Sequence, residues 1–405
     1  MLESKSQIVV RWMARSLLVV MGMSLLVACG GEGNEAVDSA ADVAQEVAAD
    51  VGDAVQEAGE AAEDAADAMG EGAADSGGTV ALLLPESKTA RYETQDRPNF
   101  EARLSALCPD CEIIYSNADQ DAAKQQQQAE AALTNGAQVM VLDPVDSDAA
   151  VAIVDRAKAA GVPVVSYDRL IKNADIDYYI SFDNERVGEL QGTALLEKMT
   201  DLGVADGTIV MINGAPTDNN AAMFKAGAHA ILDASDLTIG REYDTPDWSP
   251  DKAQSQMEQA ITALGADAID GVYCANDGTA GGAIAAMKSA GIDPLPPVTG
   301  QDAELAAIQR ILAGEQYMTV YKAIKPEAEA AAELAYALLR GESPPEGMVT
   351  GTLDNGFKEV EAVLLTPIAV TADNVADTII ADGFWTVEQI CADDYAAVCE
   401  AAGIQ

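Results

Sequence analysis

The sequence predicts an α/β protein of two lobes, each with a parallel β-sheet covered by helices on both faces. One observation is the alternation, from Thr79 onward, of short apolar segments with alanine-rich or amphipathic segments. The other is an internal repeat. Residues 136–168 and 265–302 each contain an apolar strand, a polar corner, an alanine-rich helix and a second apolar run ending in aspartate. Two such lobes, with polar residues at their strand ends, form a cleft suited to a small polar ligand.

Strands are expected where apolar residues follow one another, because a strand buried on both faces lacks the alternation of an exposed one. The expected strands are residues 79–84, 138–142, 162–167, 178–182, 207–212, 238–243, 268–275, 297–299 and 317–321. Helices are expected at residues 97–107, 121–134, 148–160, 185–199, 219–232, 250–264, 279–289, 303–313 and 326–340. Right-handed connections bring the carboxyl ends of all strands in a sheet to one edge.

The N-terminus has the features of an export signal that ends in a lipid-attachment site. Arg11 and Arg15 precede an apolar run, residues 17–27, which is too short for a comfortable membrane span. The run leads into residues 26–30 (LVACG), which resemble the bacterial lipoprotein box, in which the cysteine is lipidated. We therefore expect residues 1–29 to be a lipoprotein signal peptide, with Cys29 as the lipidation site; an ordinary secretory signal is the alternative.

Residues 30–78 are expected to form a disordered acidic tether. The stretch is rich in acidic residues, alanine and glycine, and residues 31–78 contain no lysine, arginine or aromatic residue. Such a composition buries too little apolar surface to offset the entropy lost on ordering, and like charges extend the chain.

Length and charge restrict the possible partners. The chain has 405 residues, enough for two domains, and carries 67 acidic against 23 basic residues, a formal net charge of −44. Binding to nucleic acid by phosphate neutralisation requires clustered lysine and arginine, so nucleic acid is excluded as a partner. The charge also argues against docking on anionic lipid, so the lipid anchor is the only expected contact with a membrane.

The cysteines fit an exported protein. Besides Cys29, the pairs Cys108/Cys111 and Cys391/Cys399 are possible disulfides, and Cys274 lies in an apolar strand. A zinc site needs a second pair of ligands beside Cys108 and Cys111, and the chain has a single histidine, His229. We therefore expect no metal and no cofactor.

Hydrogen-bonding side chains follow nearly every expected strand. The polar and aromatic residues at these strand ends include Arg91, Tyr92, Asp143, Asp168, Arg169, Asn213, Asp218, Asn219, Asn220, Asp244, Trp248, Asn276, Asp277, Gln301, Asp302 and Lys322. There is no glycine-rich phosphate loop and no nucleophile elbow among them. Carboxylates and arginines can each bind two adjacent hydroxyl groups, and an aromatic ring can stack on the apolar face of a pyranose. This mixture favours a sugar as the ligand.

Each of these residues also has a purely structural interpretation. Asp168 and Arg169 could form an ion pair that serves only the architecture. One residue of the segment 218–220 could cap the following helix, and so could Asn276. Trp248, which precedes Ser249-Pro250, could be a hydrophobic staple. Their occurrence together at successive strand ends favours the binding site.

Several motifs resemble the type I periplasmic binding proteins of bacteria, in particular the xylose-binding branch that serves ATP-driven sugar importers. The resemblance runs from about residue 79 to about residue 385. The motifs are residues 165–171 (VSYDRLI), 175–191 (DIDYYISFDNERVGELQ), 214–221 (GAPTDNNA), 276–284 (NDGTAGGAI), 300–306 (GQDAELA) and 318–322 (MTVYK).

The resemblance implies two flavodoxin-like, doubly wound lobes joined by a three-strand hinge, with crossovers near residues 182–184, near Lys322 and near residues 353–357. The first lobe would comprise residues 79–183 and 323–355, and the second residues 184–322 and 356–405. The implied ligand contacts are Arg91, Asp168, Arg169, Asn220, Asn276, Asp302 and Lys322, with Tyr92 and Trp248 as the aromatic residues. Xylose-binding relatives have tryptophan at the position of Tyr92.

The expected function is that of a monomeric, extracytoplasmic lipoprotein that delivers a monosaccharide, above all D-xylose, to the permease and ATPase of an importer. It would perform no chemistry. The alternatives are a glucose- or galactose-type binding protein serving a permease, chemoreceptor or sensor, and a sugar-processing enzyme with Asp168 and Asp302 as paired carboxylates. A sugar-sensing regulator is disfavoured because the signal segment and the tether occupy the place of a DNA-binding domain.

Overall fold

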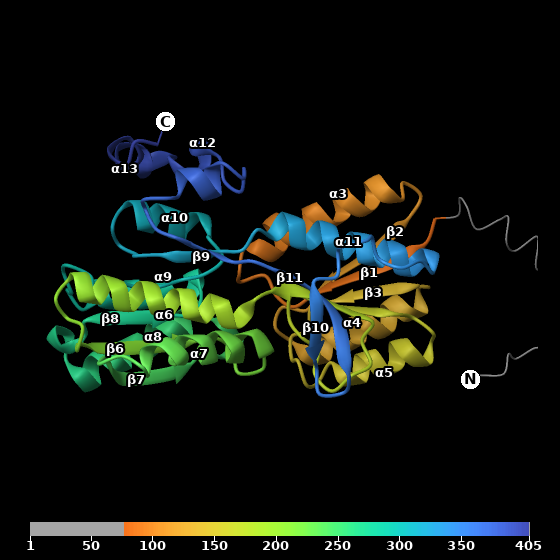
Figure 1. Ribbon diagram of the computed structural model, residues 1–405, viewed down its shortest axis with the longest axis horizontal. Coiled ribbons are helices and arrows are strands. Elements are labelled where there is room, and N and C mark those ends of the chain that lie inside the picture. The colour runs from red at the N-terminus through yellow and green to blue at the C-terminus, as the bar shows by residue number, and fades with distance from the viewer. Residues whose placement is uncertain (1–76, 405) are drawn as a thin grey trace, which may run out of the picture. The chain divides into compact units, whose positions relative to one another are not determined.

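The computed structural model describes residues 77–404, so Cys29, the expected signal peptide and nearly all of the expected tether lie outside the described residues. The described residues form two α/β lobes connected by three passages of the chain (Figure 1). Within residues 77–404, no helix combines the length and the hydrophobicity needed to cross a bilayer.

The first lobe contains a seven-stranded sheet in the order β10-β11-β5-β4-β3-β1-β2. The strands are β1 (Thr79–Leu84), β2 (Glu112–Asn117), β3 (Val139–Leu142), β4 (Val164–Tyr167), β5 (Tyr178–Phe182), β10 (Gly351–Asp354) and β11 (Glu359–Leu365). All neighbouring strands are parallel except the pair β10 and β11. Within this sheet, strands β1 to β4 lie side by side in the order β4-β3-β1-β2. This is the strand order of a doubly wound fold, as the sequence predicts.

Helices cover both faces of this sheet. One face packs on α4 (Ala122–Thr134) and α5 (Val151–Ala159), and the other on α3 (Arg97–Leu107) and α11 (Ile324–Arg340). A short π-helix, η1 (Tyr92–Asp96), precedes α3. Strands covered on both faces have continuous apolar sequences, which is why β1, β3 and β4 could be predicted.

The second lobe repeats this order. Its sheet β7-β6-β8 consists of β6 (Thr208–Asn213), β7 (Thr238–Asp244) and β8 (Gly271–Cys274), and Val298 forms a parallel bridge to Val272 of β8. Beyond this bridge lies the antiparallel pair β9 (Thr319–Tyr321) and β12 (Ile368–Val370). The helices are α6 (Asn184–Asp201), α7 (Asn219–Leu232), α8 (Pro250–Leu264), α9 (Asp277–Ser289) and α10 (Leu305–Leu312).

The chain passes between the lobes three times. The first passage lies between β5 and α6 and the second between β9 and α11, as expected. The expectation of a third crossover near residues 353–357 is wrong, because these residues form the hairpin between β10 and β11. Asn355 closes this hairpin with a side chain that accepts hydrogen bonds from the backbone of Phe357 and Lys358. The third passage instead runs from Leu365 in β11 to Ile368 in β12, so β11 belongs to the first lobe although the sequence placed it in the second.

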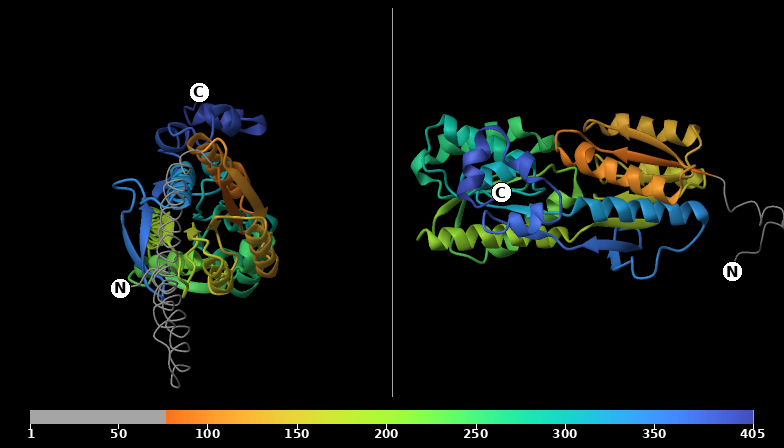
Figure 2. Two further views of the ribbon diagram at one scale, coloured as in Figure 1. Left: turned by 90° about the vertical axis from the view of Figure 1, so that its right-hand side faces the viewer. Right: turned by 90° about the horizontal axis from the view of Figure 1, so that it is seen from above.

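A C-terminal segment follows β12 and contains η4 (Ala376–Ile380), α12 (Val387–Ile390), η5 (Asp393–Tyr395) and α13 (Ala396–Ala401). Figures 1 and 2 show it in dark blue beside the second lobe. Cys391 and Cys399 form a disulfide in this segment.

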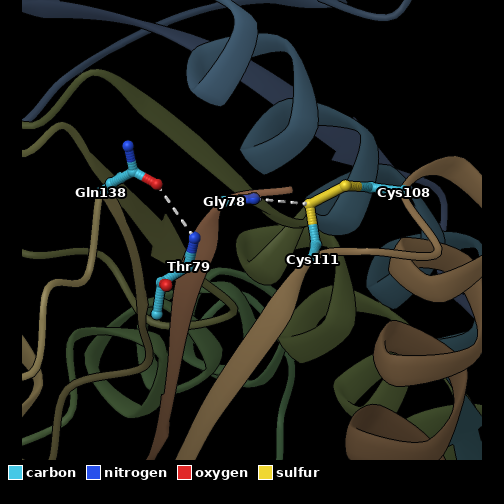
Figure 3. The surroundings of a disulfide bond; sticks show 5 residues. All are labelled: Gly78, Thr79, Cys108, Cys111 and Gln138. Carbon is cyan, nitrogen blue, oxygen red and sulfur yellow. Dashed lines mark hydrogen bonds between the residues drawn. A yellow bond between two sulfur atoms is a disulfide. The ribbon is translucent and has the colours of Figure 1, made fainter. Parts of the chain in front are cut away.

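The other cysteine pair, Cys108 and Cys111, forms a disulfide between α3 and β2. The Sγ atom of Cys111 accepts a hydrogen bond from the backbone N–H of Gly78, where the chain enters β1 (Figure 3). The neighbouring Thr79 N–H donates to the side chain of Gln138 at 3.1 Å. The disulfide therefore lies at the start of the first sheet, at the opposite end from the strand ends that carry the polar residues.

Candidate ligand-binding cavity

All nine residues predicted to contact a ligand line one cavity between the lobes. The first lobe supplies Arg91 and Tyr92 at the start of η1, and Asp168 and Arg169 after β4. Each of the nine has at most 5% of its surface exposed, so the structure represents a closed form of the cleft. The residues from the second lobe and the hinge are Asn220, Trp248, Asn276, Asp302 and Lys322.

Asp168 and Asp302 have equivalent places in the two copies of the repeat. Both have left-handed backbone conformations, with φ of 52° and 92°, which are costly for residues other than glycine. In each case the residue's N–H donates to the next strand of its own lobe, Asp168 to Ile180 and Asp302 to Val320, at 2.8 and 2.9 Å. The repeat seen in the sequence therefore extends to the backbone conformation of the two carboxylates that face the cavity.

The cations of the site lie between carboxylates. Lys322 Nζ is 3.7 Å from Asp168 Oδ1 and 3.2 Å from Asp302 Oδ1. Arg91 Nη1 donates to Asp168 Oδ1 at 3.1 Å, while its Nη2 donates to Asp96 and Glu327 at 2.7 and 2.8 Å. Burial alone would raise the pKa of Asp168, but Arg91, Lys322 and Arg169 reverse the shift and lower this pKa to about 2. Asp168 is therefore an anionic hydrogen-bond acceptor at physiological pH.

Arg169 connects the two lobes. Its Nε lies 2.9 Å from Asp218 Oδ2 in the second lobe, and its Nη2 donates to the Tyr92 hydroxyl at 3.1 Å. Asp218 also caps α7 by accepting a hydrogen bond from the N–H of Asn220 at 2.8 Å. The structural interpretation of Asp218 as a cap and its place beside the cavity therefore both hold.

The ring of Trp248 packs against side chains of the second lobe. Its Nε1–H donates to Asp218 Oδ2 at 3.0 Å, and its ring makes an edge contact with Phe224 at a centroid distance of 6.4 Å. Gly214 allows this position, because a Cβ atom there would lie 2.0 Å from Trp248 Cη2. Together with Tyr92 on the first lobe, Trp248 gives the cavity one aromatic side chain from each lobe.

The two carboxamides have different surroundings. Asn220 Nδ2 donates to the backbone carbonyl of Asp168 at 3.0 Å, and its Oδ1 accepts from Asn184. Asn276 caps α9 through its Oδ1 and forms a capping box with Thr279. No described residue accepts a hydrogen bond from Asn276 Nδ2, which leaves that amide group for the cavity.

One buried oxygen atom in the cavity wall, Gln301 Oε1, has no partner among the described residues, whereas Asp302 Oδ1 accepts no hydrogen bond but lies 3.2 Å from Lys322 Nζ. An unpaired buried polar atom costs free energy, and a ligand that donates to it recovers that cost. Thr89, Asp218, Phe224 and Gln301 also line the cavity, although the sequence did not identify them as ligand contacts. Gln301 had a signal, since it stands at a strand end beside Asp302; Phe224 lies in a helix and had none.

No metal site is associated with this cavity: within residues 77–404, no three potential ligating side chains are grouped to hold an ion. Cys274 is buried and unpaired in β8, as expected, and burial raises the pKa of its thiol.

Comparison with known proteins gives the class to which this fold and cavity belong. The periplasmic binding protein domain matches residues 80–343. The chain is 38% identical over 309 residues to the D-xylose-binding periplasmic protein of Escherichia coli, covering 75% of this chain and 90% of that protein. It is 34% identical over 338 residues to the multiple sugar-binding periplasmic receptor ChvE of Rhizobium radiobacter, covering 78% and 93%.

Among solved structures, an ABC transporter solute-binding protein of Clostridium phytofermentans with bound β-D-glucose superimposes with a TM-score of 0.71 and 31% identity. The match covers 77% of this chain and 99% of that protein. The chain belongs to the periplasmic binding protein family, which confirms the resemblance and the type I fold predicted from the sequence. Its relatives are periplasmic sugar-binding proteins, and the chain is accordingly a binding protein and not an enzyme.

Proposed function

We propose that this protein captures an aldopentose, above all D-xylose, in the cavity between its lobes and delivers it to the permease and ATPase of an ABC importer. The observation that carries the proposal is that carboxylates (Asp168, Asp302), the unpartnered Gln301 Oε1 and the donors Arg91 and Asn276 line one cavity. Sugar hydroxyl groups both donate and accept hydrogen bonds, so they suit a cavity lined by donors and acceptors.

The space left between the lobes is small, because the nine lining side chains predicted to contact a ligand are almost completely buried. A pentopyranose lacks the exocyclic hydroxymethyl group of a hexose and therefore needs less space. A relative that is 38% identical is named for D-xylose, which supports the same sugar.

A hexose such as D-glucose is the second candidate. The solved relative with 31% identity holds β-D-glucose, and the relative from Rhizobium radiobacter is named for several sugars. Tyr92 supports a wider range of sugars, because a tyrosine ring offers less area for stacking than the tryptophan of xylose-binding relatives. Its hydroxyl accepts a hydrogen bond from Arg169 at 3.1 Å and donates one to Asp168 at 3.4 Å. A chemoreceptor or sensor as the recipient of the sugar remains an alternative to the permease.

Isothermal titration of the protein with D-xylose, L-arabinose, D-ribose, D-glucose and D-galactose tests the proposal. The expected result is saturable binding with one site per chain and the tightest binding for D-xylose. Tighter binding of D-glucose would show that the preferred ligand is a hexose and not a pentose. The absence of heat for all five sugars would overturn the proposal.

We also propose that the protein is a monomer attached to the outer face of the cytoplasmic membrane through lipidated Cys29, with residues 30–78 as a tether. The proposal rests on the sequence of residues 26–30 and on the acidic composition of the stretch that follows. Incorporation of labelled fatty acid into the wild type, and its loss in Cys29→Ser, would support it. Equal labelling of the two proteins would contradict it.

A further inference from the structure

The C-terminal segment 371–404, which we call the C-terminal cap, lies beyond the residues matched by the family domain. Its apolar side chains share one core with residues from all three passages between the lobes. The cap contributes Val375, Ile379, Phe384, Ile390, Cys399 and Ile404 to this core, and the passages contribute Phe182, Tyr321, Ile324 and Val370. The cap is thus packed on the hinge and also on α10 of the second lobe, which contributes Ile308 and Ile311 to the same core.

One hydrogen bond connects the cap with the corner that carries Asp302. Trp385 Nε1 donates to the backbone carbonyl of Ala303 at 2.8 Å. Ala303 directly follows Asp302, and both residues have left-handed backbone conformations, with φ of 50° and 92°. Two consecutive residues of this kind are held only where the surroundings impose the conformation.

The remaining restraints on this corner come from the second lobe itself. Asp302 N–H donates to the carbonyl of Val320, and Ala303 N–H donates to Thr319 Oγ1 at 3.2 Å. The lobe therefore holds the two N–H groups, while the cap holds the Ala303 carbonyl through Trp385. The Ala303 carbonyl shares its peptide group with the N–H of Glu304, which donates to Asp277 Oδ2 at 3.0 Å. Loss of the Trp385 contact therefore leaves this peptide group with one restraint instead of two. The carboxylate of Asp302 belongs to the residue before Ala303.

The cap also contacts the first lobe. Gln95 Nε2 donates to the carbonyl of Phe384 at 3.4 Å, and Gln95 precedes Asp96, the residue that holds Arg91. Phe384 in turn packs its ring on Tyr321 and Trp385, at centroid distances of 5.0 and 5.5 Å. One short segment, Phe384-Trp385, thus contacts the first lobe, the hinge and the corner at Asp302.

We propose that Trp385 is a positioning residue for ligand binding: it fixes the Ala303 carbonyl and thereby orients Asp302 in the cavity. The disulfide between Cys391 and Cys399 keeps the cap that carries Trp385 folded. This inference rests on the proposed function, because it concerns the affinity of the same cavity for a sugar.

The test is a double-mutant cycle that combines Trp385→Phe with Asp302→Asn, measured by titration with D-xylose and, in parallel, with D-glucose. Trp385→Phe keeps an aromatic ring but removes the N–H donor together with one of the two fused rings of the indole. It should weaken sugar binding by about three- to tenfold, the effect of one neutral hydrogen bond, with little change in the unfolding midpoint. In the Asp302→Asn background the same substitution should have no further effect on affinity, because its effect passes through Asp302.

A matched control is Gln309→Leu, which removes another hydrogen bond to the cap, from Gln309 Nε2 to the carbonyl of Ile390 at 3.1 Å, without reaching Ala303. It should leave sugar affinity unchanged. Replacing Cys391 and Cys399 by serine should weaken sugar binding, whereas the same change at Cys108 and Cys111, at the start of the first sheet, should not.

An equal loss of affinity from Trp385→Phe in the wild-type and Asp302→Asn backgrounds would overturn the inference, and so would an unchanged affinity in the single variant. If the wild type binds neither sugar, the proposed function fails instead, so the two failures can be distinguished.

Discussion

Asp168 of the first lobe and Asp302 of the second lobe share one ammonium group, because Lys322 Nζ lies 3.7 Å from one carboxylate and 3.2 Å from the other. Lys322 follows β9 in the second passage between the lobes. Burial lowers the pKa of a lysine, but the two carboxylates outweigh this effect and raise the pKa of Lys322. Closure of the lobes therefore brings two negative charges together around a cation that belongs to the hinge.

Asp302→Asn should weaken sugar binding by about 10- to 100-fold, because a hydrogen bond to a charged group contributes about 1.5–3 kcal/mol. The substitution also leaves Lys322 with Asp168 alone as an ionic partner. Titration calorimetry with D-xylose measures the effect. Asp373→Asn is a suitable control, since this exposed carboxylate in the C-terminal cap lies outside the cavity, and it should bind like the wild type. Wild-type affinity in Asp302→Asn would show that the Asp302 carboxylate does not contribute to sugar binding.

Gly214→Ala should weaken sugar binding by about tenfold, since the added Cβ would meet the Trp248 ring at 2.0 Å and displace it from its stacking position. The shift can be followed independently by the tryptophan fluorescence spectrum. Gly351→Ala is the matched control: no atom lies within 4 Å of its added Cβ, so it should leave both the affinity and the spectrum unchanged. Unaltered binding in Gly214→Ala would show that the ring of Trp248 need not hold this position.

Ser147→Ala should weaken sugar binding by about three- to tenfold through an effect on closure. Ser147 Oγ of the first lobe accepts a hydrogen bond from Asn219 N–H of the second lobe at 3.1 Å, and opening of the lobes breaks this bond. Stopped-flow fluorescence should show faster dissociation of the sugar. Ser235→Ala removes a hydroxyl that contacts only the second lobe, and it should dissociate the sugar at the wild-type rate. Equal dissociation rates for Ser147→Ala and the wild type would contradict this role.

His229 should titrate above its ordinary pKa of 6.5. Partial burial lowers this pKa, but hydrogen bonds with Asp233 and Glu242 outweigh burial and raise it. The contribution of His229 to stability should therefore be fully present below pH 6.5 and be lost as the pH rises through the higher folded-state value. Because the chain has a single histidine, its ring protons give an unambiguous NMR titration. A measured pKa at or below 6.5 would contradict the ion pairs.

Most of the strands predicted from the sequence are apolar runs covered on both faces, but β7 (Thr238–Asp244) was predicted although it is a largely exposed edge strand. Strand β11 (Glu359–Leu365) was missed although residues 362–365 are apolar. Strand β2 (Glu112–Asn117) was missed because it is a half-exposed edge strand with only three consecutive apolar residues. The misplaced third crossover arose at Asn355-Gly356, where a tight hairpin interrupts the strands and no apolar pattern distinguishes a hairpin from a crossover. The local sequence indicates which residues are buried, but it does not show which strands pair, and the pairing decides whether a connection is a hairpin or a crossover.

For the cavity, the strand ends supplied a wider set of polar residues, and the family resemblance selected the nine expected ligand contacts from it. Asp143, Asn213, Asn219, Asp244 and Asp277 stand at strand ends but do not line the cavity, whereas Thr89 and Phe224 line it and were missed. Their mutual geometry could not be predicted, because it depends on the contact between lobes. The approach of Arg169 to Asp218 and the fit of Trp248 on Gly214 are such cases. The contact of Trp385 with Ala303 could not be predicted either, since it joins residues 82 positions apart.

Native mass spectrometry of the protein in an equimolar mixture of D-xylose and D-glucose tests the central claim most directly, since it reports which sugar the cavity retains. We predict one pentose bound per chain, with loss of the adduct in Asp302→Asn. Retention of a hexose would contradict the assignment of the sugar, and the absence of any adduct would contradict the assignment of the cavity as a sugar-binding site.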